Sequence, residues 1–167
     1  TVFADGNDNG LINTDEPGIA GTMIRLYGTD ASGKFIDITT ITDANGNVTY
    51  IVYDYDSHDT RIYSGWNTST NAPTGPTIVQ REDQARGYRE TLTMSATPNL
   101  TSSKPNGTES ISSIESLSRE VMNEAGQVLY RDEYFDLTGT SYSQSTVTLG
   151  MSGTNYNRTT LAYNKLG

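Results

Sequence analysis

The chain has 167 residues and a formal net charge of −9, with 20 acidic side chains against 11 lysines and arginines. This length is sufficient for one domain or two small ones, and the acidic balance disfavours nucleic acid and anionic membranes as partners. The absence of cysteine excludes disulfides and thiolate metal sites, and no apolar run approaches the ~20 residues of a membrane-spanning helix. Tyrosine outnumbers phenylalanine by 11 to 3 amid abundant Ser, Thr, Asn and Gly, which is typical of an extracellular β protein.

The first motif along the chain, residues 5–16, has the spacing of a calcium-binding loop, D-x-N-x-N-G-x-x-x-x-x-E. Oxygens at alternate positions can surround one cation, Gly10 permits the sharp bend, and the final glutamate can close the cage with both carboxylate oxygens. No helical pattern flanks the loop, so we do not expect an EF-hand, and the alternative is a polar surface turn. The predicted ligands are Asp5, Asn7, Asn9, the Leu11 carbonyl, Asn13 and Glu16.

Most of the remaining chain has the alternation or the β-branched content of strands. In residues 111–121 the apolar spacing also permits a short helix, but serine is frequent there and is a weak helix former. We therefore expect a strand from Leu117 onward. Strands are predicted at residues 22–27, 35–38, 48–53 and 88–96, and a polar loop at residues 98–110.

A turn motif, [DN]-x-x-G, recurs five times after apolar or β-branched stretches. The Asp or Asn side chain accepts hydrogen bonds from backbone N–H groups at the start of the turn, and the glycine takes a positive φ without a Cβ clash. One such motif carries almost no information, but five in strand contexts predict an all-β fold of successive antiparallel hairpins, a β-meander. The motifs begin at Asp30, Asp43, Asn123, Asp136 and Asn164.

The N-terminal third resembles a known family. The calcium motif, the following Glu16-Pro17-Gly18, and the stretch Asp43-Ala44-Asn45-Gly46-Asn47-Val48-Thr49-Tyr50 are similar to the B-type repeats of serine–aspartate-repeat surface adhesins. This resemblance implies a calcium-binding, immunoglobulin-like β-sandwich module over residues 1–55, with the metal bound by the predicted ligands. The family often has Asp at the position of Asn13, so the loss of that charge should weaken binding here.

The remainder, residues 56–167, resembles the YD-repeat (Rhs-type) proteins, in which hairpins wind into a long β-sheet spiral. The first motif departs from the family pattern because no glycine follows the aspartate, and the third has Asn in place of Asp. The resemblance implies an antiparallel β region that builds shells, stalks or fibres, and an uninterrupted apolar stretch also allows both regions to share one continuous sheet. The similar motifs are Tyr53-Asp54, Tyr134-Phe135-Asp136-Leu137-Thr138-Gly139 and Tyr163-Asn164-Lys165-Leu166-Gly167.

Catalytic constellations are poor in this chain. Ser57, His58 and Asp59 are triad residue types, but sequence neighbours on a strand point to opposite faces and cannot form a relay. His58 is the only histidine, and we expect no enzymatic activity. We expect the single Trp66 in the core rather than as a sugar-stacking platform.

Attached carbohydrate is a separate prediction. Five stretches fit the Asn-x-Ser/Thr acceptor pattern, although several matches are expected by chance in a chain this rich in Asn, Ser and Thr. We expect the polar loop at residues 98–110 to be the most accessible of them. The candidate acceptors are Asn47, Asn67, Asn99, Asn106 and Asn157.

These observations favour a non-catalytic extracellular structural module, as a repeat unit or subunit of a bacterial surface fibre. The alternatives are a shell fragment of an Rhs-type polymorphic toxin and a carbohydrate-binding adhesin module. Residues 164–167 have the pattern of a hairpin turn and Thr1–Ala4 that of a strand, so the next copy of the chain would supply the strand that follows the turn. Such a head-to-tail contact between copies is heterologous and builds a filament.

Calcium bound at residues 5–16 should stabilise the folded chain by about 2.7 kcal/mol at a hundredfold excess over the dissociation constant. Removing the closing carboxylate with Glu16→Gln should abolish most of the rise in melting temperature that calcium causes, whereas Glu124→Gln should preserve it. Calorimetry with calcium and with a chelator measures both variants. A melting temperature that the chelator leaves unchanged would contradict the site.

Overall fold

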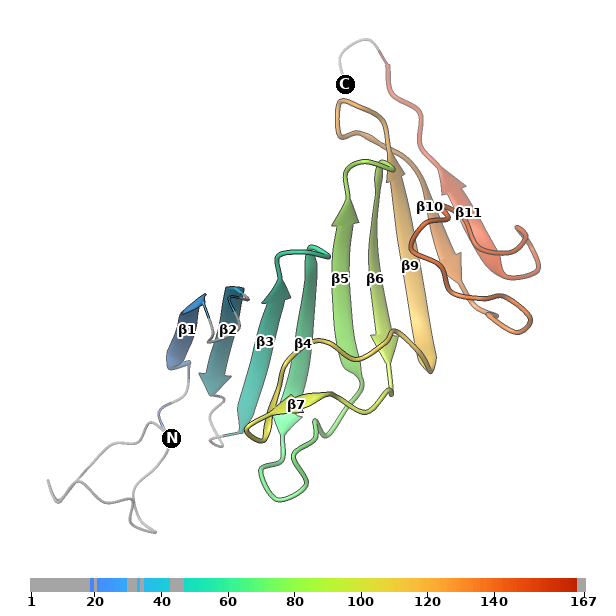
Figure 1. The fold of residues 1–167 in the computed structure, drawn as a ribbon. Helices are drawn as coiled ribbons and strands as arrows, with labels where there is room; N and C mark the ends of the chain where they lie inside the picture. Colours follow the sequence, from blue (N-terminus) through green and yellow to red (C-terminus); the bar gives the residue numbers. More distant parts are fainter. Residues whose placement is uncertain (1–18, 20, 30–32, 34, 43–46, 165–167) are drawn as a thin grey trace, which may run out of the picture.

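The computed structural model describes residues 19, 21–29, 33, 35–42 and 47–164. Within them, nine strands form a single antiparallel sheet in the order β1-β2-β3-β4-β5-β6-β9-β10-β11, and β7 and β8 form a separate small hairpin (Figure 1). The predicted all-β fold is therefore confirmed. The strands are β1 Met23–Thr29, β2 Phe35–Thr42, β3 Val48–Asp54, β4 Asp59–Trp66, β5 Thr77–Asp83, β6 Tyr88–Met94, β7 Leu100–Thr101, β8 Lys104–Pro105, β9 Ile114–Met122, β10 Val128–Tyr134 and β11 Tyr156–Thr160.

The segment with two sequence interpretations forms strand β9 rather than a helix. The predicted polar loop contains the β7–β8 hairpin, whose turn residues Ser102 and Ser103 have φ of 51° and 62°. Consecutive positive φ values in a two-residue connection are typical of a type I′ turn, which matches the twist of the two strands it joins.

The Asn123 turn forms as predicted. The Asn123 side-chain oxygen accepts hydrogen bonds from the backbone N–H of Ala125 at 3.0 Å and of Gln127 at 2.9 Å, and Gly126 has φ +78°. This turn joins β9 to β10 as a hairpin. β1 also pairs with β2, and β2 with β3, across the Asp30 and Asp43 motifs, whose turn residues lie largely outside the described residues, as does most of the Asn164 motif.

The prediction of a hairpin at Asp136 is wrong. The turn itself forms, because the Asp136 carboxylate accepts a hydrogen bond from the backbone N–H of Thr138 at 2.8 Å and Gly139 has φ +72°. It nevertheless opens a long loop, residues 135–155, that separates β10 from β11. The local turn chemistry is the same in both cases, but this loop is needed to cover one face of the sheet.

Three further hairpins use a turn that is one residue longer and that the [DN]-x-x-G pattern missed. In each, an Asp or Asn side-chain oxygen accepts a hydrogen bond from a backbone N–H two or three residues later, and the residue four places on has a positive φ. Those later residues tolerate the left-handed conformation, since glycine, asparagine and histidine are enriched there. The turns run from Asp54 to His58 (φ 56°), from Asn67 to Asn71 (φ 52°) and from Asp83 to Gly87 (φ 66°).

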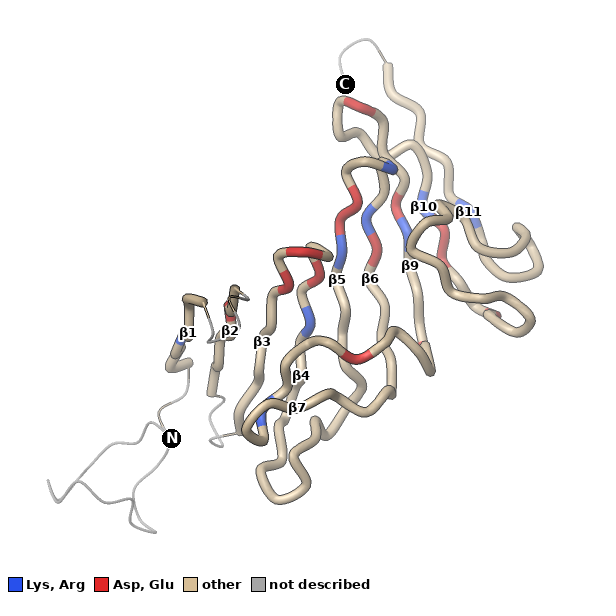
Figure 2. Tube along the Cα trace, in the orientation of Figure 1, with Lys and Arg blue, Asp and Glu red and all other residues tan. Residues whose placement is uncertain are grey.

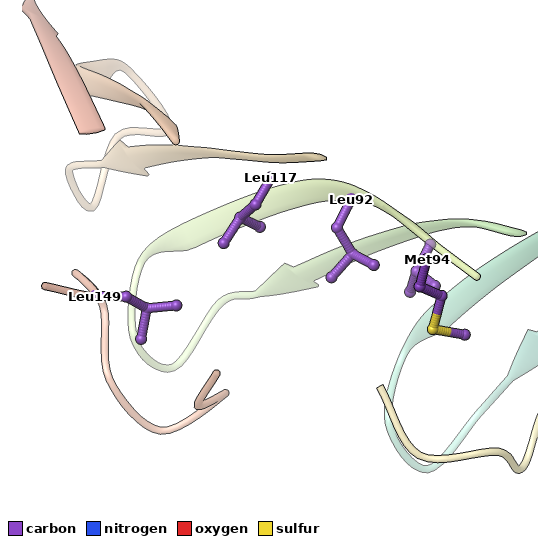
Figure 3. Packing of buried hydrophobic residues seen from close by; sticks show 5 residues of the cluster. Leu92, Met94, Leu117 and Leu149 are labelled. Carbon is purple, nitrogen blue, oxygen red and sulfur yellow. The ribbon is translucent and has the colours of Figure 1, made fainter. Parts of the chain in front are cut away.

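One face of the sheet is covered by two loops, residues 95–113 and 135–155 (Figure 1). We call this the covered face and the opposite one the open face. Side chains of the covered face alternate with open-face ones, and the core packs beneath the loops. Buried Leu92, Met94 and Leu117 pack with Leu149 of the second loop (Figure 3). A second cluster contains Trp66, which lies in the core as predicted.

The N-terminal third shares the sheet with the rest of the chain. β3 pairs with β4 through six residue pairs that include Ile51 with Ile62, so backbone hydrogen bonding continues across residue 55. The immunoglobulin-like sandwich over residues 1–55, and the division into two domains at that point, stay predictions because residues 1–18 lie outside the described residues.

Candidate functional site

The predicted calcium site lies outside the described residues. Within the described ranges, no group of three or more His, Cys, Asp or Glu side chains is arranged to hold a metal ion. The calcium site stays a prediction from the sequence. The ligands concerned are Asp5, Asn7, Asn9, Leu11, Asn13 and Glu16.

The candidate glycan acceptors lie at the surface, with one exception. Asn106 is half-buried, its amide nitrogen donates to the Thr101 hydroxyl at 3.1 Å, and its oxygen accepts from the backbone N–H of Thr108 at 3.1 Å. A glycan on Asn106 would break these bonds, so it is the least accessible acceptor. The exposed candidates are Asn47, Asn67, Asn99 and Asn157.

The structure separates the three residues with triad chemistry. Asp59 is buried on the covered face, where it accepts two hydrogen bonds from Arg81 at 2.5 and 2.7 Å. His58 occupies the left-handed position of the β3–β4 turn, and its Nδ1 lies 3.0 Å from the Tyr53 hydroxyl. The carboxylate and the imidazole therefore have different partners, and the sequence-adjacent trio is not a relay.

The most distinctive group of polar side chains is a network of buried ion pairs on the covered face. No side chain in it is more than 8% exposed, and three arginines balance three carboxylates, so the network is formally neutral. We call it the ion-pair network. Its N–O contacts are Arg61–Glu109 2.8 Å, Arg61–Asp59 3.6 Å, Arg81–Asp59 2.5 Å, Arg81–Glu90 3.8 Å and Arg119–Glu90 2.8 Å.

Strand register explains why the charges alternate. Residues of opposite sign stand directly opposite each other on successive strands, as the red and blue segments of β5, β6 and β9 show (Figure 2). Opposite charges at such positions stabilise a sheet by about 0.2–1 kcal/mol per pair. The row continues beyond the network to a further pair on β10 and β11, in which Arg158 donates to both oxygens of Asp132 at 2.6 Å. The row is Asp59, Arg81, Glu90, Arg119, Asp132 and Arg158.

The network ties the second covering loop to the sheet. Arg119 donates to the backbone carbonyls of Ser143 at 2.8 Å and Val147 at 3.2 Å, and also to that of Thr146. Tyr142 of the same loop donates its hydroxyl to Glu90. Burial, together with the Glu90 carboxylate, raises the pKa of Tyr142, so its hydroxyl remains protonated and donates.

The first covering loop is held in the same way, through Glu109. Its carboxylate accepts hydrogen bonds from the Tyr63 hydroxyl at 2.7 Å and from the backbone N–H of Asn99 at 3.2 Å, while Arg61 donates to its backbone carbonyl at 2.7 Å. Burial raises the pKa of Tyr63, and Glu109 adds to the rise. Each carboxylate of the network is bound by an arginine, so the arrangement fixes loops rather than exposing a free acid or base to a substrate.

The open face carries a shallow groove of ≈1100 Å³ over β4–β6, β9 and β10. In its floor Glu120 lies between Arg89 and Arg131, both of which donate to its carboxylate. At one end of the groove stand Tyr53 and His58. From there a row of aromatic rings in edge-to-face contact extends toward β1, with centroid distances of 4.6 Å (Tyr53–Tyr55), 4.5 Å (Tyr55–Phe35) and 4.8 Å (Phe35–Tyr27).

Exposed large hydrophobic side chains gather at the two opposite edges of the sheet. Among the described residues, only Tyr55 and Leu100 of this kind lie between the edges. Sequence analysis missed this pattern, because the exposed side chains of β1 have the same alternation as buried ones. At the β1 edge they are Ile19, Met23, Ile24, Leu26 and Tyr27, and at the β10–β11 edge Leu129, Phe135, Met151, Leu161 and Tyr163.

Comparisons with known proteins give no relative for this chain. No protein-family model matches it, and neither a curated protein nor a solved structure is significantly similar. In the described part of the chain, no helix has the length and apolar character needed to cross a membrane. The function has to follow from the geometry of the chain itself.

Glu90→Gln preserves the shape of the side chain but removes the charge that Arg119 and Arg81 face. An uncompensated buried charge costs about 3–5 kcal/mol, so we expect a loss of that size in the free energy of unfolding. Glu115→Gln, exposed on neighbouring β9, should change it by less than about 0.5 kcal/mol. Urea unfolding measures both variants, and equal losses would contradict a special role for the network.

Stability should also fall in acid through carboxylates that arginines hold on the open face. The hydrogen bond from Arg25 lowers the pKa of Asp37. Burial opposes ionisation of Glu120, but hydrogen bonds from Arg131 and Arg89 outweigh it, so the pKa of Glu120 is lowered too.

Because these folded-state pKa values lie below the unfolded ones, the stabilisation is complete above an unfolded carboxyl pKa of about 4 and is lost as pH falls through the folded values. We expect the free energy of unfolding to decline below about pH 4, and Glu120→Gln to decline less steeply. Urea titrations at a series of pH values test this. An equally steep decline in Glu120→Gln would show that other carboxylates dominate.

Proposed function

We propose that this chain is a non-catalytic extracellular structural module, a repeat unit or subunit of a bacterial surface fibre whose copies join head to tail by strand pairing. One observation carries the proposal: within the described residues, each outermost strand has a hydrogen-bonded neighbour on one side only. β1 pairs with β2, and β11 pairs with β10. A row of unpaired backbone N–H and C=O groups is a template for a further strand.

The side chains of β1 support this function. Soluble proteins protect edge strands with charges, proline, bulges or a covering segment. The one charge on β1, Arg25, is bound to Asp37 of the neighbouring strand by hydrogen bonds of 2.7 and 2.5 Å. The rest of the edge presents apolar side chains on both faces, which favours a covering partner. The exposed fractions are Met23 64%, Ile24 54%, Leu26 59% and Tyr27 60%.

The interior supports a structural role as well. The ion-pair network anchors both covering loops through charge-assisted hydrogen bonds in a chain without cysteine. A sheet that is fixed in this way can carry its two edges as stable joining surfaces. We propose that calcium at residues 5–16 adds to this stability next to the β1 edge, as the sequence motif predicts.

A second candidate is a carbohydrate-binding adhesin module, and the groove on the open face favours it. Tyr53 and His58 give the groove an aromatic end, and hydroxyl and amide side chains such as Thr60 and Gln80 line it. Aromatic rings with polar tips beside hydrogen-bonding groups suit a sugar. Glycan-array binding that Tyr53→Ala abolishes, and that Tyr130→Ala outside the groove preserves, would support this candidate.

The assembly is tested by sedimentation velocity and electron microscopy at increasing protein concentration with calcium. We expect the 167-residue chain to form a concentration-dependent series of linear oligomers. Leu26→Lys places a charge on the β1 edge and should shift the chain toward monomer. Leu100→Lys, at an exposed position away from both edges, should assemble like the unmodified chain.

Two results together would contradict the assembly. The first is a chain that stays monomeric at high concentration with calcium. The second is a gene that encodes one copy of this unit beside unrelated domains, because tandem copies in a single polypeptide would join without association in solution.

A further inference from the structure

Strand direction constrains how two copies can join. The nine strands of the sheet are linked by eight pairings, and every one is antiparallel. After an even number of reversals, β11 runs in the same direction as β1. If β11 of one copy contacted β1 of the next directly in a continued sheet, that pair would be parallel. It would be the single parallel pair at each junction, and parallel pairing is slightly less stable per residue.

We infer that the junction contains one additional strand, inserted between β11 of one copy and β1 of the next and antiparallel to both. This inference rests on the proposed head-to-tail assembly. The strand that we assign to this position is Thr1–Ala4 of the copy that contributes β1. With it, every strand pair in the assembly is antiparallel, as within the sheet itself.

The N-terminal segment enters the sheet at the right place for this role. The backbone N–H of Gly21 donates to the Thr42 carbonyl at 2.7 Å, and the Thr42 hydroxyl donates to the Ile19 carbonyl at 2.5 Å. The chain therefore reaches β1 at the start of its free edge. β1 has 7 residues and spans about 23 Å, and residues 5–18 are long enough to return alongside it at about 3.3 Å per residue.

The side chains on either side of the proposed strand suit an apolar insert. β1 offers Ile24 and Leu26 on one face and Met23 and Tyr27 on the other, all exposed, and Leu161 is exposed at the β11 edge. The segment Val2-Phe3-Ala4 is apolar at successive positions, as is typical of a strand buried on both faces. Its insertion would cover both edges at once, whereas a β1–β1 contact between copies would leave the β11 edge uncovered.

The Asn123 turn gives the register. Its flanking residues pair through a hydrogen bond from the Asn123 N–H to the Gln127 carbonyl at 2.9 Å. The same turn at Asn164–Gly167 would place Asn164 opposite Thr1 of the next copy. Counting back three residues from Asn164 and forward three from Thr1 puts Leu161 opposite Ala4 in the assembly.

Disulfide trapping tests this arrangement without background, because the chain has no cysteine. Leu161→Cys is mixed with an equal amount of Ala4→Cys under mild oxidation, and we expect a cross-linked dimer of the two variants. In matched mixtures, Leu161→Cys is combined with Met23→Cys or Tyr27→Cys at the two ends of β1. With a strand inserted, β1 lies about 9.6 Å from β11, beyond the ~7 Å Cα separation that a disulfide spans, so these mixtures should remain uncrosslinked.

The outcomes separate this inference from the proposed function. Assembly with a cross-link from position 161 to position 23 or 27 would show direct contact of β11 with β1, which overturns the inserted strand and keeps the assembly. Assembly without any of these cross-links also overturns the inserted strand. Sedimentation that shows no assembly of any variant counts against the proposed function itself.

Discussion

The arrangement of the whole molecule depends on pairing buried charges across strands. Six strands carry residues of alternating sign in one row from Asp59 to Arg158. Removing a charge from water costs several kcal/mol, so each residue of this kind requires a partner of opposite sign at hydrogen-bond distance. A slip of one residue in any strand would turn its charge to the other face and leave its neighbours unpaired. The row thus selects one register for strands β4 to β11.

The same charges decide where the two covering loops lie. Arg119 extends past its carboxylate partner to three backbone carbonyls of the loop at residues 135–155, and Glu109 brings the loop at residues 95–113 onto Arg61 and Tyr63. Once held there, the loops exclude water from the leucines and methionine beneath them (Figure 3). Apolar burial and ion pairing therefore support each other, because each provides the dry surroundings in which the other is strong.

The loops leave the two edges of the sheet without such cover, and this contrast relates the fold to function. The middle strands are saturated by backbone pairing, ion pairs and loop contacts. The outer strands keep unpaired backbone groups and exposed apolar side chains. A module with a rigid middle and two open edges suits end-to-end assembly better than it suits catalysis, for which a convergent set of reactive groups in a cleft is required.

The sequence by itself determined the elements of this protein, because alternation and turn chemistry are local. The strand patterns of β1, β2, β3 and β6 and the Asn123 turn depend on residues that are near neighbours in the chain. Only the tertiary structure decided the partner of each charge: Arg61 binds Glu109 across 48 positions, and no local pattern carries that information. For the same reason Asp136 looked like another hairpin. Its side chain forms the expected turn, but the covering of a distant face decides where the following chain goes.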